Sequence, residues 1–186
     1  MYNTKMKNVI IFHGTGDTNK LYWFPYLKRE LEKKGYKVWL PQLPNAKNPN
    51  LADWLSFVLK NGSFTKDTIL IGHSAGAQLI LSLLEKVKVG RAILVSGYAE
   101  PLPKTSNSKQ RDVLNWKIIR KHIHDIIFIH SDNDPWGCGD KQGKILLNNL
   151  GGTLIIRHGE GHMGSTTYKQ PYKKFPLIVK LIELEE

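Results

Sequence analysis

Short apolar runs alternate with longer amphipathic stretches along the 186-residue chain. The short runs are rich in β-branched residues, which predicts six strands at residues 8–13, 37–40, 68–72, 92–96, 126–130 and 153–157. The intervening stretches repeat apolar residues every three or four positions, which predicts six helices at residues 23–34, 51–61, 75–87, 109–121, 141–150 and 172–184. This alternation predicts a three-layer α/β fold: a mostly parallel sheet of about six strands with helices on both faces.

The length fits one domain over residues 1–186, large enough to fold without disulfides or a metal. The single cysteine, Cys138, cannot form an internal disulfide, which fits a reducing compartment. No apolar run reaches the roughly 18 residues of a membrane-spanning helix, and the short run at residues 9–12 does not resemble a signal peptide. We therefore expect a cytoplasmic protein without membrane association.

The formal net charge is +11, from 27 Lys and Arg against 16 Asp and Glu. A basic balance of this size can indicate a nucleic acid or an anionic surface as partner. The basic residues are scattered, however, with no run of five and no recognised nucleic-acid-binding motif. The pattern favours a solvated basic surface over nucleic-acid binding.

The main chemical signal is the pentapeptide Gly72-His73-Ser74-Ala75-Gly76, which lies between a predicted strand and a predicted helix. G-x-S-x-G in this context is typical of the nucleophile elbow. The two glycines permit a turn so tight that the serine is held in strained backbone geometry. We expect Ser74 to be exposed at the carboxyl edge of the sheet, with the Ala75 N–H at the helix start available to an oxyanion.

A nucleophilic serine needs a base and a group that orients the base. A parallel sheet brings the loops after the fifth and sixth predicted strands to the edge that carries Ser74. The first loop offers Asp132 and Asp134, and the second offers His158 and His162. His162 is the better base, because its glycine-flanked loop can fold back over Ser74, whereas His158 ends a strand. Loop reach favours Asp134 as the acid and leaves Asp132 to cap a turn, with both carboxylates still candidates.

The first predicted strand ends in His13-Gly14-Thr15-Gly16. A dinucleotide-binding loop would need a third glycine where Asn19 stands, and an acidic residue after the second strand, and both are missing. The alternative is an oxyanion loop whose backbone faces the nucleophile. We assign the N–H of Thr15, together with that of Ala75, to the oxyanion hole, although the choice of donor within the loop stays open.

Two stretches resemble part of a metal-binding motif, but neither motif is complete. The stretch 132–134 begins like a calcium loop, but Gly143 occupies the position of the ligating glutamate. His158 and His162 have helical spacing, but the glycines between them disfavour a helix. Cys138 lacks an elbow, so we expect a buried free thiol. No metal or cofactor is expected.

Over nearly its full length the sequence resembles the small serine hydrolases of the retinoblastoma-binding protein 9 type, a minimal branch of the α/β-hydrolases. The resemblance is carried by Trp23-Phe24-Pro25-Tyr26-Leu27, Pro41-Gln42-Leu43-Pro44, Pro49, Trp54, Trp116, Ile118, Asp134-Pro135 and Gly161-His162. It implies an α/β-hydrolase-like fold and a catalytic triad of Ser74, Asp134 and His162. The chain differs from the family at Trp136-Gly137-Cys138 and at Met163, next to the expected acyl pocket.

We therefore expect a serine hydrolase that cleaves small carboxylic esters or amides through an acyl-enzyme, with no cofactor. His13, His73, Trp136 and Met163 are expected to line the substrate pocket. The stretch 98–107 leaves room for a minimal lid only. The alternative is a protein-binding module on a hydrolase scaffold, with little or no turnover, because a fold does not fix a function.

Overall fold

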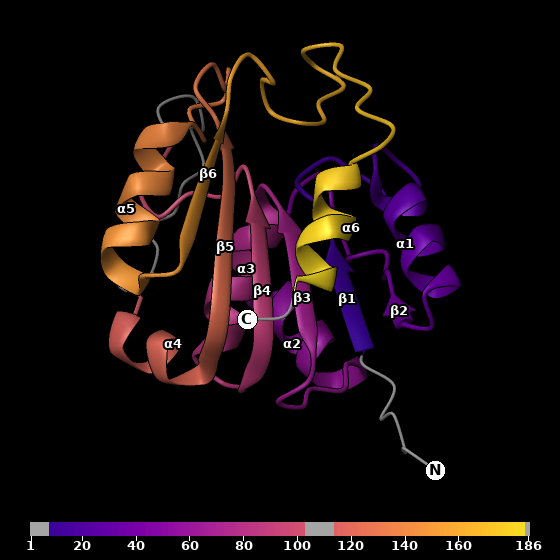
Figure 1. Cartoon of the computed structure of the whole chain (residues 1–186), viewed down its shortest axis with the longest axis vertical. Coiled ribbons are helices and arrows are strands. Elements are labelled where there is room, and N and C mark those ends of the chain that lie inside the picture. Colours follow the sequence, from indigo (N-terminus) through magenta and orange to yellow (C-terminus); the bar gives the residue numbers. More distant parts are fainter. Residues whose placement is uncertain (1–7, 103–113, 185–186) are drawn as a thin grey trace.

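The computed structural model describes residues 8–102 and 114–184, and these form a sheet covered by helices (Figure 1). The strands are β1 (Asn8–Phe12), β2 (Lys37–Trp39), β3 (Ile69–His73), β4 (Val89–Val95), β5 (Ile123–Ser131) and β6 (Thr153–Arg157). They lie in the order β2-β1-β3-β4-β5-β6, and every neighbouring pair is parallel. The predicted six-stranded α/β fold is confirmed, and its carboxyl edge gathers the loops that follow β1, β3, β5 and β6.

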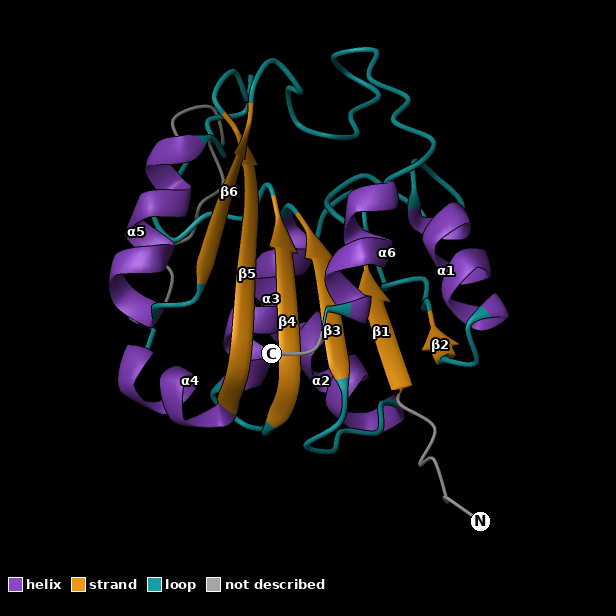
Figure 2. Cartoon of the chain, in the orientation of Figure 1, coloured by secondary structure: helices purple, strands orange, loops and turns teal. Residues whose placement is uncertain are grey.

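Helices cover both faces of the sheet (Figure 2). They are α1 (Phe24–Lys33), α2 (Leu51–Asn61), α3 (Ala75–Leu84), α4 (Trp116–His122), α5 (Asp140–Leu150) and α6 (Pro176–Glu183). Helices α1 and α6 pack on one face, and α2 to α5 pack on the other. In the helices of the described residues, no segment is both long and apolar enough to cross a bilayer.

The central strands are buried on both faces, so their side chains alternate between two hydrophobic cores. In β1, Val9 and Ile11 face α1 and α6, whereas Ile10 and Phe12 face the helices on the other side. Strand β6 differs, because it forms an edge of the sheet and none of its residues is fully buried. The central strands therefore appear in the sequence as continuous apolar runs, which is why their positions could be predicted.

Two predicted helices start several residues later in the structure. Helix α6 starts at Pro176 and not at residue 172, because Tyr172 has a φ of 36°, which no helix accommodates. Helix α4 starts at Trp116, where the side chain of Asn115 accepts the N–H of Ile118. Most of the expected lid, and the first part of the helix expected at 109–121, lie in residues 103–113, outside the described residues.

Candidate active site

Ser74 occupies the tight turn between β3 and α3. Its φ of 54° and ψ of −119° are rarely adopted by a residue with a side chain. The turn is held by two backbone hydrogen bonds: Ser74 N–H donates to the carbonyl of Val95 (2.9 Å), and its own carbonyl accepts from Ala77 (2.9 Å). The strand–turn–helix geometry that the pentapeptide predicts is therefore present.

The two glycines of the pentapeptide allow backbone to pass close to backbone. A Cβ on Gly72 would lie 2.6 Å from the main chain of Gly76, and a Cβ on Gly76 would lie 2.4 Å from the carbonyl oxygen of Phe12. Neither neighbour is a side chain that could rotate away. Any larger residue would thus push the start of α3 away from β1 and displace Ser74.

Asp134 and His162 meet at the same edge of the sheet. His162 Nδ1 lies 2.7 Å from Asp134 Oδ2, and both side chains are almost fully buried. The other carboxylate oxygen, Oδ1, accepts the backbone N–H of Trp136 at 2.9 Å. Because the carboxylate can only accept, Nδ1 carries the proton and Nε2 is left as an acceptor. Burial lowers the pKa of His162 against the opposing effect of Asp134, which keeps the ring neutral near pH 7.

Asp132 has a separate set of contacts on the surface. Its Oδ2 pairs with Nδ1 of the exposed His158 at 2.6 Å, and its Oδ1 accepts the N–H of Gly159 at 2.9 Å. The Gly159 hydrogen bond and the pairing with His158 lower the pKa of Asp132. Of the two carboxylates that the sequence offered, Asp134 is the one in contact with His162.

The loop after β6, residues 158–164, is termed the histidine loop. Three consecutive side chains at the end of β5 accept three of its backbone N–H groups. Asp132 accepts from Gly159, while Ser131 Oγ accepts from Glu160 (2.9 Å) and Asn133 Oδ1 accepts from Gly161 (2.7 Å). The N–H of His162 itself donates to Gln170 Oε1 at 2.9 Å. Side chains from two other segments therefore fix the histidine loop.

The backbone carbonyl of His162 accepts hydrogen bonds from one residue in β3 and one directly after β4. His73 Nε2 donates to the carbonyl of His162 at 2.9 Å, and Ser96 Oγ donates to the same oxygen at 3.1 Å. The imidazole rings of His73 and His162 have centroids 4.9 Å apart, which brings the histidine loop against the residue preceding Ser74. Within the described residues, no hydrogen bond joins Ser74 Oγ to the His162 ring. Catalytic hydrogen bonds are often loose before substrate binds.

Three of the four residues predicted to line the pocket are buried in the structure. His13, His73 and Met163 are 0%, 1% and 0% exposed. The ring of His13 joins the loops after β1 and β2. Its Nδ1 donates to the Gly14 carbonyl (2.9 Å), and its Nε2 accepts the N–H of Leu43 (3.0 Å). The assignment of these three residues to the substrate pocket stays a prediction.

Trp136, the fourth, is partly exposed beside the histidine loop. Its ring lies edge-on to His162, with centroids 6.4 Å apart, and edge-on to Tyr168 at 5.2 Å. The indole N–H donates to Ser165 Oγ at 3.3 Å. This placement is compatible with a wall beside the His162 ring.

The loop after β1 lies against the elbow, since a Cβ on Gly14 would be 3.1 Å from the Cβ of Ser74. The N–H of Gly14 donates to Asp17 Oδ2 (3.2 Å), and that of Gly16 donates to the carbonyl of Ala46 (2.6 Å). Thr15, between them, is exposed, and its N–H has no acceptor among the described residues. Among residues 14–16, Thr15 is therefore the one whose N–H has no acceptor in the described part of the chain.

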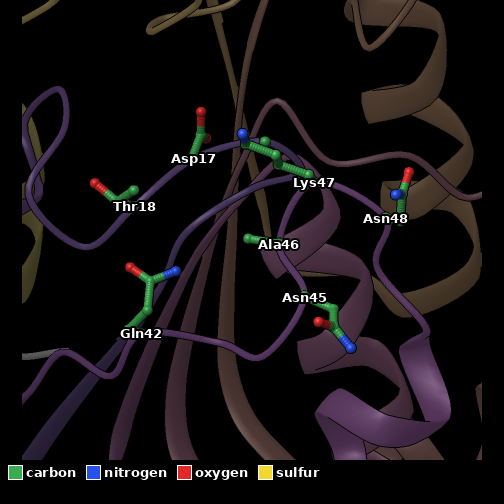
Figure 3. A pocket seen from close by; sticks show the side chains of 8 residues that line it. Asp17, Thr18, Gln42, Asn45, Ala46, Lys47 and Asn48 are labelled. Carbon is green, nitrogen blue, oxygen red and sulfur yellow. The ribbon is translucent and has the colours of Figure 1, made fainter.

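A polar cavity of about 550 Å³ opens beside this loop (Figure 3). Residues 16–18 form one wall, and residues of the loop after β2, Gln42 and 45–48, form the other. Its side chains supply amides, a hydroxyl and the charges of Asp17 and Lys47. None of the residues predicted to line the substrate pocket is among those that line this cavity.

Cys138 lies close to the Asp134–His162 pair. One possible ligand atom from each of Asp134, Cys138 and His162 lies within 4.8 Å of the other two, a convergence that sequence spacing did not reveal. Burial, and then the charge of Asp134, raise the pKa of the Cys138 thiol well above its usual value, so the sulfur keeps its proton at neutral pH. His162 Nδ1 is already hydrogen-bonded to Asp134. A metal would have to displace the proton of the Cys138 thiol and the proton of His162 Nδ1. The geometry is therefore that of a hydrogen-bonded Asp134–His162 pair beside a neutral thiol.

Known proteins match the chain in sequence and in structure. The serine hydrolase family matches residues 9–183. YdeN of Bacillus subtilis (strain 168) is 37% identical over 167 residues, which cover 84% of this chain and 85% of YdeN. The serine hydrolase RBBP9 of Rattus norvegicus is 25% identical over 163 residues, which cover 85% of this chain and 87% of RBBP9.

The crystal structure of the ydeN gene product of B. subtilis superposes on this chain with a TM-score of 0.86. That alignment covers 95% of this chain and 97% of the other, at 26% identity. The family resemblance stated from the sequence is thus confirmed, and so is the assignment to an enzyme class. The chain belongs to the serine hydrolase family and is a hydrolase with the α/β-hydrolase fold.

Proposed function

We propose that the protein hydrolyses small carboxylic esters, and by the same route amides, through an acyl-enzyme on Ser74. The observation that carries the proposal is the buried Asp134–His162 pair. It leaves His162 Nε2 as the free acceptor, on a loop anchored to the residue before a strained, elbow-type serine. A neutral imidazole in this tautomer is what a general base for a serine requires.

In the proposed reaction, Ser74 Oγ attacks the substrate carbonyl while His162 Nε2 takes the hydroxyl proton. Asp134 keeps the imidazole in the required tautomer and stabilises the imidazolium that forms. The N–H groups of Thr15 and Ala75 donate to the oxyanion, since neither has another acceptor among the described residues. His162 then protonates the leaving alcohol or amine, and water repeats the sequence to release the acid.

A fluorophosphonate probe tests the nucleophile directly, because it reacts covalently with an activated serine. We expect the wild-type protein to be labelled at Ser74, whereas Ser74→Ala should not be labelled and should lose ester hydrolysis by about 10³-fold or more. Ser63→Ala removes an exposed serine elsewhere in the chain and serves as the matched control. A folded Ser74→Ala variant with wild-type turnover would refute the assignment, and failure of the wild type to label would favour a binding role.

A further inference from the structure

Asp17 lies in the loop after β1, and the sequence motifs gave it no role. Its carboxylate is largely buried, with the residue 8% exposed, and it forms part of the wall of the polar cavity (Figure 3). A carboxylate loses hydration when it is buried, so it needs partners that replace the water. Its partners are two parts of the site that come from different strands.

The first partner is the oxyanion loop. Asp17 Oδ2 accepts the N–H of Gly14 at 3.2 Å, and the N–H of Asp17 points back to the carbonyl of Gly14 at 3.4 Å. These two contacts close residues 14–17 into a turn with Thr15 near its tip. Asp17 thus occupies the Gly14 N–H and, since the Gly16 N–H donates to Ala46, the Thr15 N–H between them is left for the substrate.

The second partner is His73. Asp17 Oδ2 lies 3.6 Å from His73 Nδ1, which is too long for a hydrogen bond, and both side chains are shielded from water. The opposite ring nitrogen, Nε2, donates to the carbonyl of His162, so Nε2 must carry a proton. The carboxylate lies against the Nδ1 edge of the buried ring and therefore limits its rotation by contact, which holds the Nε2–H toward the histidine loop.

We propose that Asp17 is a positioning residue that fixes the oxyanion loop directly and the main chain of His162 through His73. The inference rests on the proposed hydrolase mechanism, because it assigns Thr15 and His162 their roles there. Asp17 does not touch the reacting atoms. It links the loop after β1 to the loop after β6, so that the oxyanion donor and the base keep a fixed relative position.

Kinetics of Asp17 variants test the proposal. Asp17→Ala removes both contacts, and we expect kcat for p-nitrophenyl butyrate to fall about 10- to 100-fold with KM changed less than about threefold, because small displacements of catalytic groups are costly. Asp17→Asn keeps the shape and an acceptor for Gly14, and should recover kcat to within about fivefold of wild type. Asp53→Asn removes an exposed carboxylate on α2 and should leave kcat unchanged.

A second measurement does not depend on turnover. In ¹⁵N-histidine-labelled protein, the buried His73 Nε2–H should give a slowly exchanging signal, which Asp17→Ala should weaken or abolish and Asp17→Asn should retain. This signal separates the role proposed for Asp17 from the proposed hydrolase function, because it is expected even if the protein fails to hydrolyse esters. The proposal is overturned if folded Asp17→Ala keeps both the His73 signal and the wild-type kcat, or loses the signal without a loss of kcat. Should Asp17→Ala not fold, His73→Phe takes its place, because it removes the side chain that joins Asp17 to the carbonyl of His162, and a wild-type kcat in the folded variant would overturn the proposal.

Discussion

The Asp134→Asn substitution probes the site most sharply, because both carboxylate oxygens accept a hydrogen bond. One bond comes from His162 Nδ1 and the other from the backbone N–H of Trp136. An asparagine has only one acceptor oxygen, so its NH₂ group must replace one carboxylate oxygen. The backbone N–H cannot change into an acceptor, whereas the imidazole can. The amide oxygen should therefore face Trp136, and the NH₂ should face His162.

That arrangement forces the His162 proton from Nδ1 to Nε2, and Nε2 can then no longer accept the proton of Ser74. Loss of the correct tautomer in a triad of this kind costs roughly 10⁴-fold in kcat, which corresponds to about 5.4 kcal/mol of transition-state stabilisation. We expect Asp134→Asn to lower kcat for p-nitrophenyl butyrate by about this factor. The protein should stay folded, because the substitution conserves shape.

Asp132→Asn is the matched control, since it changes the same functional group two residues away. Asp132 contacts the exposed His158 and the N–H of Gly159, and Asn can still accept from the latter. We expect less than about a threefold change in kcat, because exposed ion pairs contribute little. Steady-state kinetics and the ¹⁵N shifts of His162 measure the two effects. Equal losses in both variants, or an unchanged His162 tautomer in Asp134→Asn, would refute the reasoning.

Two further predictions concern pH and substrate length. Burial lowers the pKa of His162, so the acid limb of the kcat/KM profile should lie below the ordinary histidine value of about 6.5; a limb above that value would contradict the assigned base. For p-nitrophenyl esters, kcat/KM should peak at roughly two to six acyl carbons. The cavity beside the oxyanion loop is open and lined by amide and charged side chains, so we expect it to bury little of a longer acyl chain, whose CH₂ groups would each gain about 0.8 kcal/mol on burial. A steady rise to about twelve carbons would show a long apolar tunnel.

The sequence predicts well those features that depend on local pattern or on topology. A buried parallel strand such as β3 forms a continuous apolar run, and parallel strands place their following loops at one edge of the sheet. These two facts were enough to predict that Asp134 and His162 lie at the edge of the sheet where the turn after β3 carries Ser74. The strained φ of Ser74 also follows from the glycines on either side.

Other features depend on packing that no local pattern records. Ser96 reaches the carbonyl of His162 across 66 positions of sequence, and its side chain has no motif to mark it. No sequence motif marks Asp17 either, because His73, against which its carboxylate lies, comes from another strand. His13 is marked by a motif, but its burial could not be predicted. Its side chain points toward the loop after β2, where it accepts the N–H of Leu43.

The loop after β6, at an edge of the sheet, carries the proposed base His162, whereas Ser74 follows the interior strand β3. Edge segments with few buried residues are the first to open in local fluctuations. An opening of β6 would withdraw the histidine loop and leave the elbow, the oxyanion loop and most of both cores in place. Heat should consequently inactivate the enzyme before it melts the fold, and cooling should return the activity without a refolding step.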